Sequence, residues 1–172
     1  VHTEYSLLDG ALRISDLVKT ANDLNMPGVA ITDHGNVFGA IEFFKMARGQ
    51  GLKPILGCEV YVAPKSRLEK KTGNGDEGGN YHLILLVKDE KGYRHLCKLI
   101  TSAYLEGFYY RPRIDKDILR EHSSGLIALS SCLKGEINDF LVKDMDDRAE
   151  AAARQYLEIF GEGNFYLEIQ DH

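Results

Sequence analysis

The sequence predicts an α/β fold, which we interpret as a β/α barrel that is incomplete at both ends. Helix-like and strand-like segments alternate along all 172 residues, with no long linker and no internal repeat. Side chains that can bind metal ions follow several separate strands. An open doubly wound sheet gathers its ligands at one switch point, whereas a barrel brings residues from many strand ends to one rim. This distribution favours the barrel.

The first half of the chain alternates between amphipathic helices and apolar strands. Apolar residues at helical spacing predict a helix over 14–24, with Ser15 available as its cap. A strand is expected at 28–32, and another over 53–62. Between them lies a second helical stripe, formed by Val37, Ala40, Ile41 and Phe44.

The second half continues the alternation after a glycine-rich and charge-rich segment, 66–79, that predicts a mobile loop. Further strands are expected at 81–87, 126–130 and 165–169, and helices over 93–104 and 149–160. Five strands are therefore visible, and a sixth is implied before His2.

Composition indicates one soluble domain over 1–172, because 44% of the residues are hydrophobic and 27% are charged. No stretch approaches the roughly 20 apolar residues of a membrane helix. Three cysteines without CxxC spacing argue against a disulfide framework and for a reducing, cytoplasmic compartment. A net charge of −5 counts against nonspecific duplex binding, so any nucleic-acid contact must be local. Because Val1 is not a methionine, we expect both ends to be cuts in a longer protein.

The strongest functional signal is the apolar run that ends in Asp33-His34-Gly35. A buried parallel strand followed by an acid and an imidazole places both at its carboxyl end, where α/β proteins bind ligands. A capping turn before the next helix is the simpler interpretation. Glu59 lies inside a strand, where a carboxylate is costly unless it is paired or bound to metal.

Four other candidates each have a simpler interpretation alone. His2 can be a terminal polar residue, Asp9 part of a turn, His82 a core histidine and Cys132 a small packing residue. Together the candidates are more informative, because imidazole, carboxylate and thiolate at one rim suit Zn²⁺ and similar transition ions. An all-oxygen set would have indicated Mg²⁺ or Ca²⁺.

The segment Tyr109-Tyr110-Arg111-Pro112-Arg113 offers two arginines flanking a proline after two tyrosines. Such a rigid cationic edge with stacking faces could bind a single nucleic-acid strand, with Arg111 and Arg113 as the substrate-binding residues. An ordinary surface turn is the alternative.

Six motifs, at 2–11, 31–35, 57–61, 81–83, 130–133 and 168–172, resemble the PHP (polymerase and histidinol phosphatase) domain of bacterial DNA polymerase III alpha subunits. The resemblance implies a distorted seven-stranded β/α (TIM-like) barrel with up to three ions, Zn²⁺ or Mn²⁺, and nine ligands. Six of those positions, which would be catalytic through the bound metals, are His2, Asp9, His34, Glu59, His82 and Cys132. The other three, a histidine before Val1 and an Asp-x-His pair after His172, would lie outside this chain.

The resemblance also implies a function, which is metal-dependent 3′ to 5′ exonuclease proofreading within a protein that synthesises DNA. Its partners would be the 3′ end of a DNA primer strand, the remainder of the polymerase chain, a proofreading exonuclease subunit and other replisome subunits. The alternatives are a phosphatase or pyrophosphatase, and a catalytically silent module that braces the polymerase and docks a separate proofreading subunit. We expect the 172-residue fragment alone to be inactive, to bind metal poorly and to self-associate.

Overall fold

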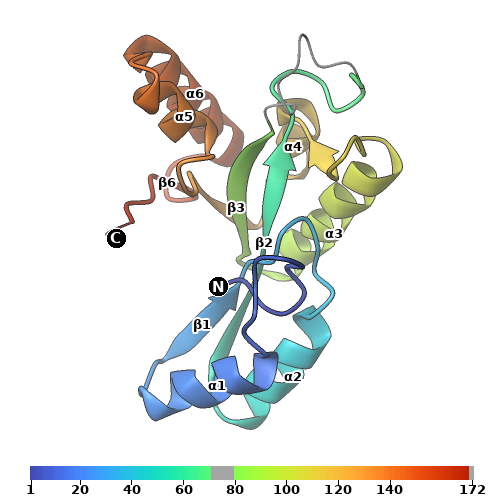
Figure 1. The fold of residues 1–172 in the computed structure, drawn as a ribbon, viewed down its shortest axis with the longest axis vertical. Coiled ribbons are helices and arrows are strands. Elements are labelled where there is room, and N and C mark those ends of the chain that lie inside the picture. The colour runs from blue at the N-terminus through green and yellow to red at the C-terminus, as the bar shows by residue number, and fades with distance from the viewer. Residues whose placement is uncertain (71–79, 171–172) are drawn as a thin grey trace.

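The computed structural model describes residues 1–70 and 80–170 (Figure 1). Part of the expected mobile loop, 71–79, and the end of the last motif, 171–172, lie outside the described residues. The helices and strands follow one another in the order α1 (Ile14–Asp23), β1 (Gly28–Ile31), α2 (Ala40–Gly49), β2 (Lys53–Val62), β3 (Tyr81–Val87), α3 (Glu90–Leu105), β4 (Arg113–Ile114), α4 (Lys116–His122), β5 (Leu126–Leu129), α5 (Glu136–Val142), α6 (Asp146–Phe160) and β6 (Phe165–Tyr166).

The six strands form one mixed sheet of order β1-β2-β3-β5-β6, with β4 paired to β2 off this path. β1 and β4 run parallel to β2, and β6 runs parallel to β5, but β3 is antiparallel to both β2 and β5. The α/β class is as predicted. The seven-stranded barrel is not confirmed, because the sheet does not close in the described part of the chain. A β/α barrel needs parallel neighbours, and the reversal at β3 departs from that pattern.

β2 is the longest strand and the one that organises the fold. Its first half pairs with β1 and its second half with β3 and β4. Figure 1 shows β2 running through the molecule from the α1 and α2 end toward the α4 end. One apolar cluster joins α1, β1 and α2, and a larger cluster joins the second half of β2 to β3, β5 and helices α3 to α6. Val1 belongs to no strand in the described residues, but its backbone nitrogen donates to Ala30 O at 3.1 Å, so the segment that carries His2 lies beside β1.

Helix α1 confirms its prediction, although Arg13 rather than Ser15 occupies the cap position, and it makes no side-chain bond. The helix begins at Ile14 as predicted, so Ser15 lies in its first turn and not at its cap. The predicted stripe of α2 is wrong in part. Ile41 and Phe44 are 58% and 45% exposed, because the face that meets the core is formed by Ala40, Phe43 and Ala47.

Three short elements were not predicted from the sequence, namely α4, α5 and β4. Helices of seven residues carry too few periodic positions to give a hydrophobic signal. The Asp115 carboxylate caps α4 by accepting from Ile118 N at 3.0 Å. No helix in the described ranges, 1–70 and 80–170, combines the length and the apolar character that crossing a membrane requires.

A buried polar contact joins α5 to α6 within the larger cluster. Tyr156 is 1% exposed and donates its hydroxyl to Glu136 Oε2 at 2.8 Å, while Lys116 Nζ lies 2.8 Å from Glu136 Oε1. Burial beside this carboxylate raises the pKa of Tyr156 well above its usual value. The phenol therefore stays protonated and keeps donating.

We expect Tyr156→Phe to lower the free energy of unfolding by about 2 kcal/mol, because it removes a buried hydrogen bond to a charged group. Tyr166→Phe is the matched control, since Tyr166 is 51% exposed and its hydroxyl donates to Gly163 O, three residues away. Urea denaturation of both variants measures the difference. Equal stability of the two variants would contradict this account of the α5 and α6 contact.

Candidate metal centre

The predicted ligands converge on Glu59, in the middle of β2. Its backbone is held between the two residues that flank His34: Glu59 N donates to Asp33 O at 3.0 Å, and Gly35 N donates to Glu59 O at 2.9 Å. His34 and Glu59 therefore face each other as an isolated parallel bridge just beyond β1. Strand register alone brings the imidazole to the carboxylate.

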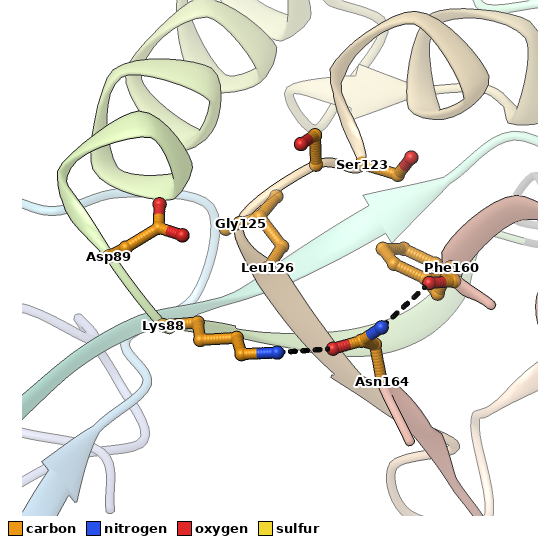
Figure 2. Close-up of a pocket in the computed structure, with 8 residues that line it drawn as sticks. Lys88, Asp89, Ser123, Gly125, Leu126, Phe160 and Asn164 are labelled. Carbon is orange, nitrogen blue, oxygen red and sulfur yellow. Dashed lines mark hydrogen bonds between the residues drawn. The ribbon is translucent and has the colours of Figure 1, made fainter. Parts of the chain in front are cut away.

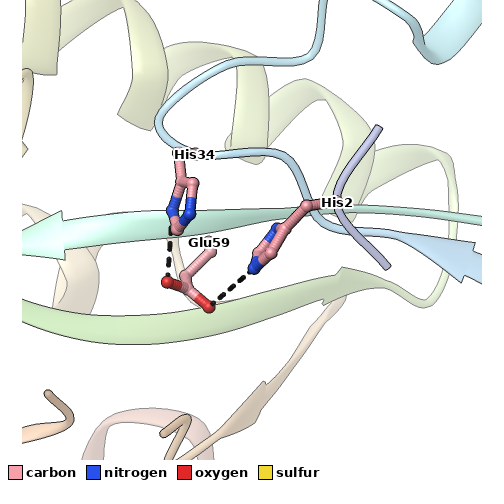
Figure 3. Close-up of side chains that lie close together, drawn as sticks. All are labelled: His2, His34 and Glu59. Carbon is pink, nitrogen blue, oxygen red and sulfur yellow. Dashed lines mark ion pairs between the residues drawn. The ribbon is translucent and has the colours of Figure 1, made fainter. Parts of the chain in front are cut away.

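His2, His34 and Glu59 form the first group of possible ligands (Figure 3). Their candidate ligand atoms lie within 4.8 Å of one another. His34 Nδ1 is 3.2 Å from Glu59 Oε1, and His2 Nε2 is 3.8 Å from Glu59 Oε2. The two imidazole rings stack with their centres 4.2 Å apart. Both rings thus turn a nitrogen toward one carboxylate.

Glu59, His82 and Cys132 form the second group. His82 Nδ1 is in contact with Glu59 Oε1, and Cys132 Sγ lies 3.8 Å from His82 Nδ1. The loop after β5 closes over the start of β3, because His82 N donates to Lys134 O at 2.9 Å. Glu59 is the one member common to both groups.

Asp9 lies on the outer side of the first group. Its Oδ2 is 2.8 Å from His34 Nε2 and 4.0 Å from His2 Nε2. The side chain of Asp9 is 58% exposed, whereas that of Glu59 is 5% exposed. All six predicted ligands are therefore brought together, five of them in the two groups and Asp9 at their solvent side.

The charges of the centre are coupled. Burial alone would raise the pKa of Glu59, but the imidazoles of His34 and His82 hold it well below its usual value. The Glu59 carboxylate in turn raises the pKa of His34, and His34 lowers that of Asp9. Glu59 is therefore ionised at neutral pH, and a metal ion must compete with a proton for His34.

Two buried polar atoms of the centre indicate whether the site suits a cation. Among the described residues, His34 Nδ1 and Glu59 Oε1 are buried and make no well-directed hydrogen bond, although they lie 3.2 Å apart. Buried polar atoms that lack a well-directed hydrogen bond are uncommon and costly, even where, as at Glu59 Oε1, an imidazole nitrogen of His82 is in contact. Imidazole, carboxylate and thiol are also the donors that transition ions prefer. The residues present fit a metal ion at Glu59.

Asp33 was one of the sequence candidates, and the structure gives it a supporting place. Its 1% exposed carboxylate accepts from Thr3 N at 2.6 Å, from Thr3 Oγ1 at 2.8 Å and from Ser6 Oγ at 2.7 Å. These bonds fasten the segment that carries His2 and Asp9 to the end of β1. The polar residues of that segment carry no hydrophobic pattern, so the sequence did not predict this role.

Two further neighbours were also missed. Ser131 donates to Glu59 Oε2 at 3.3 Å, and its backbone is left-handed with φ of 65°. Tyr61 packs between His34 and His82, with ring centres 6.1 and 5.2 Å away. The alternation of β2 could have identified Tyr61, because residues two apart on a strand share a face.

The expectation that metal-binding side chains follow several separate strands is only partly right. His34 and Cys132 do follow β1 and β5, but Glu59 lies within β2 and His82 is the second residue of β3. Because β3 is antiparallel, its beginning lies at the edge of the sheet where β5 ends.

Arg113 also departs from its prediction as an exposed substrate contact. It is 4% exposed, and its guanidinium donates to Gly107 O, Arg67 O and Glu69 O at 2.7 to 3.1 Å. These bonds hold the backbone of residues 67–69 and of Gly107 against the buried Arg113 side chain. Arg111 is exposed, and its guanidinium carbon lies 5.7 Å from the centre of the Tyr61 ring.

A separate cavity of about 430 Å³ lies beyond the other end of β3 (Figure 2). It is lined by Lys88, Asp89, Ser123, Ser124, Gly125, Leu126, Phe160 and Asn164. Within its lining Lys88 Nζ donates to Asn164 Oδ1 at 3.0 Å, and Asp89 accepts from Gly92 N, outside the lining, at 2.8 Å. The candidate chemistry is therefore at the Glu59 end.

Comparison with known proteins places these features in a family. The model of the PHP domain matches residues 1–172. The chain is 53% identical to the DNA polymerase III alpha subunit of Thermus aquaticus, over 99% of this chain and 14% of that protein. It is 48% identical to the alpha subunit of Treponema pallidum, over 100% of this chain and 15% of that protein. The chain thus spans about a seventh of the length of these relatives.

Among solved structures, one described as a metal-dependent phosphoesterase from Bifidobacterium adolescentis is 21% identical to this chain. The match covers 94% of this chain and 42% of that chain, with a TM-score of 0.42.

We expect Asp33→Asn to lower the free energy of unfolding by about 3 kcal/mol, because the amide replaces one acceptor with a donor that faces other donors. Zn²⁺ affinity should fall about tenfold, since His2 and Asp9 lose their fixed position. Calorimetry with and without Zn²⁺ measures both effects. Asp23→Asn is the control, because Asp23 is exposed and its carboxylate pairs with Lys19 on the same helix. Unchanged Zn²⁺ affinity in Asp33→Asn would show that Asp33 does not position the centre.

Proposed function

This chain belongs to the PHP domain family, and we propose that it is the PHP domain of a DNA polymerase III alpha subunit, in which it hydrolyses phosphodiester bonds at a metal centre built on Glu59. The observation that carries this proposal is the sharing of Glu59 between two ligand groups. A carboxylate common to two groups of donors is the arrangement that two-metal hydrolases use.

Two ions would be held by the residues present. His2, His34 and Glu59 would hold one, and Glu59, His82 and Cys132 the other, with Asp9 available on the solvent side. The thiol of Cys132 favours Zn²⁺ in the second group, whereas the imidazoles and carboxylates also suit Mn²⁺. A third ion would need ligands beyond those of this chain.

The chemistry that bound metal supplies is an activated water and neutralisation of charge on the phosphate. The protein residues set the positions of the donors. His2 Nδ1 donates its proton to Thr32 O at 2.8 Å. The lone pair of Nε2, on the side that faces Glu59, would therefore be available to a metal ion. Ser131 donates to Glu59 Oε2 and thereby keeps the carboxylate oriented. No nucleophilic side chain is required.

In the full-length protein, we propose that this activity removes nucleotides from the 3′ end of a primer strand beside a polymerase that performs DNA-directed DNA synthesis. Its partners would be DNA, the remainder of the polymerase chain and other replisome subunits. The names of the relatives support this assignment. A module that only braces the polymerase and docks a proofreading exonuclease subunit is the alternative outcome of the experiments below.

We expect His34→Ala and Glu59→Ala in the full-length protein to lower kcat/KM for 3′ to 5′ digestion of single-stranded DNA by more than about a hundredfold. Both should also lower metal content and the midpoint of thermal unfolding, because the neighbouring donors stay buried without a partner. Metal analysis, digestion assays without deoxynucleotides and calorimetry make the three measurements.

Glu158→Ala is the matched control, because Glu158 is an exposed carboxylate on α6 away from the centre. It should leave all three quantities unchanged. If the two alanine variants lose metal and stability but even the wild type digests no DNA, the result would favour the bracing module. Full metal content with unchanged digestion in Glu59→Ala would refute the assignment of the centre.

We expect Cys132→Ser to weaken Zn²⁺ binding by about tenfold or more, while Mn²⁺-supported digestion is largely kept, since a hydroxyl is a poor ligand for softer ions. Cys97→Ser is the control, because Cys97 lies on α3 outside both ligand groups. Titration of each metal into the three proteins measures the affinities. Equal Zn²⁺ affinity in all three would assign Cys132 a packing role instead.

A further inference from the structure

Arg111 is a cation beside the metal centre that has no anionic partner in the described part of the chain. Its guanidinium carbon lies 5.7 Å from the centre of the Tyr61 ring, and its backbone carbonyl accepts from Tyr109 N at 3.0 Å. Arg94, Arg120 and Arg154, which are also exposed, each pair with a carboxylate on their own helix, whereas Arg13, Arg48 and Arg148 are exposed without such a pair among the described residues but lie away from the Tyr61 ring. In a protein with a net charge of −5, an unpaired guanidinium is available to an anion from outside.

Tyr61 connects this cation to the ligands. The ring of Tyr61 is nearly parallel to that of His34, at 21° and 6.1 Å, and meets His82 edge-on at 5.2 Å. One aromatic ring thus separates Arg111 from two metal-ligating histidines. An anion that pairs with Arg111 would lie next to the metal centre, and not within it.

The turn that carries Arg111 is held on both sides. A Cβ atom at Gly35 would come within 2.8 Å of Pro112 Cγ, so the proline ring lies directly against the residue after His34. The residue after Pro112 is the buried Arg113, whose guanidinium makes three hydrogen bonds to backbone carbonyls. Arg111 is therefore presented from a fixed backbone, which lowers the entropic cost of binding.

Tyr110 adds an aromatic face to this position. Its side chain is 80% exposed, and its φ of 56° is in the left-handed region, which is unfavourable for a bulky residue. Its ring meets that of Tyr109 at 72°, with the centres 4.6 Å apart, and Tyr109 in turn lies 5.2 Å from the Arg113 guanidinium carbon. The anchored turn therefore carries an exposed aromatic ring at the residue before Arg111.

We propose that Tyr110 and Arg111 form an accessory site for the nucleotide adjoining the scissile bond of a single-stranded nucleic acid. Arg111 pairs with the phosphate of that nucleotide, and Tyr110 stacks on its base, which is how sequence-tolerant single-strand sites are built. The inference rests on the proposed function, because it names residues beside the same centre that would bind its substrate. A polynucleotide reaches both sites, whereas a phosphomonoester reaches the metal centre alone.

The first test is binding in EDTA, where neither metal nor hydrolysis takes part. Fluorescence anisotropy at low salt measures the affinity of this 172-residue chain for a labelled oligothymidine strand. We expect Arg111→Ala and Tyr110→Ala each to weaken binding by about tenfold. Arg111→Lys should restore part of the affinity, because it keeps the charge but loses the planar fork. Arg94→Ala, the matched control, should bind as the wild type does.

The second test is selectivity in Mn²⁺, in the full-length protein. The ratio of kcat/KM for the oligonucleotide to that for bis(p-nitrophenyl) phosphate, which has a single phosphate, should fall by about tenfold in Arg111→Ala. Equal binding in EDTA by the wild type, Arg111→Ala and Arg94→Ala would overturn the inference, as would no binding by the wild type. Binding that depends on Arg111 without hydrolysis by any variant would support the accessory site and contradict the proposed hydrolytic function.

Discussion

Glu59 is an ionised carboxylate buried within a strand, and the arrangement of the surrounding elements follows from the cost of placing it there. An unpaired buried charge is strongly unfavourable, so such a group must be surrounded by partners. The structure supplies His34 from the end of β1, His82 from the start of β3 and Ser131 from the loop after β5. Each partner comes from a different element, so the carboxylate ties together the sheet and its loops.

The loops that meet at Glu59 are held by polar bonds rather than by apolar packing. Asp33 fastens the N-terminal segment through Thr3 and Ser6, and Asn138 donates to Ser131 O and Cys132 O. Left-handed backbone at Leu8, Ser131 and Tyr110 adjoins Asp9, Cys132 and Arg111 respectively. Strained positions of this kind persist only where the surroundings over-determine them, and they often accompany functional sites. The centre thus depends on the supporting shell as much as on its ligands.

The mixed sheet also explains why one end of the molecule holds the chemistry. Reversal at β3 brings His82 back toward Glu59, whereas Lys88, just beyond the other end of β3, lies at the separate cavity. Tyr61 is on the same face of β2 as Glu59 and leads from the ligands to Arg111. The candidate metal ligands, the Tyr61 ring and the Arg111 guanidinium therefore follow one another at this end of β2.

The sequence by itself determined which segments form the main helices and strands and which residue types could bind metal. Apolar periodicity is a local property, so 14–24, 53–62 and 81–87 could be assigned without tertiary information, and a carboxylate at Glu59 was costly in any buried strand. Only the tertiary structure decided the direction of β3, the open sheet, and the exposure of Arg111 as against the burial of Arg113. Strand direction and burial depend on contacts between residues far apart in the chain, and identical side chains two positions apart carry no local mark of which one will be buried.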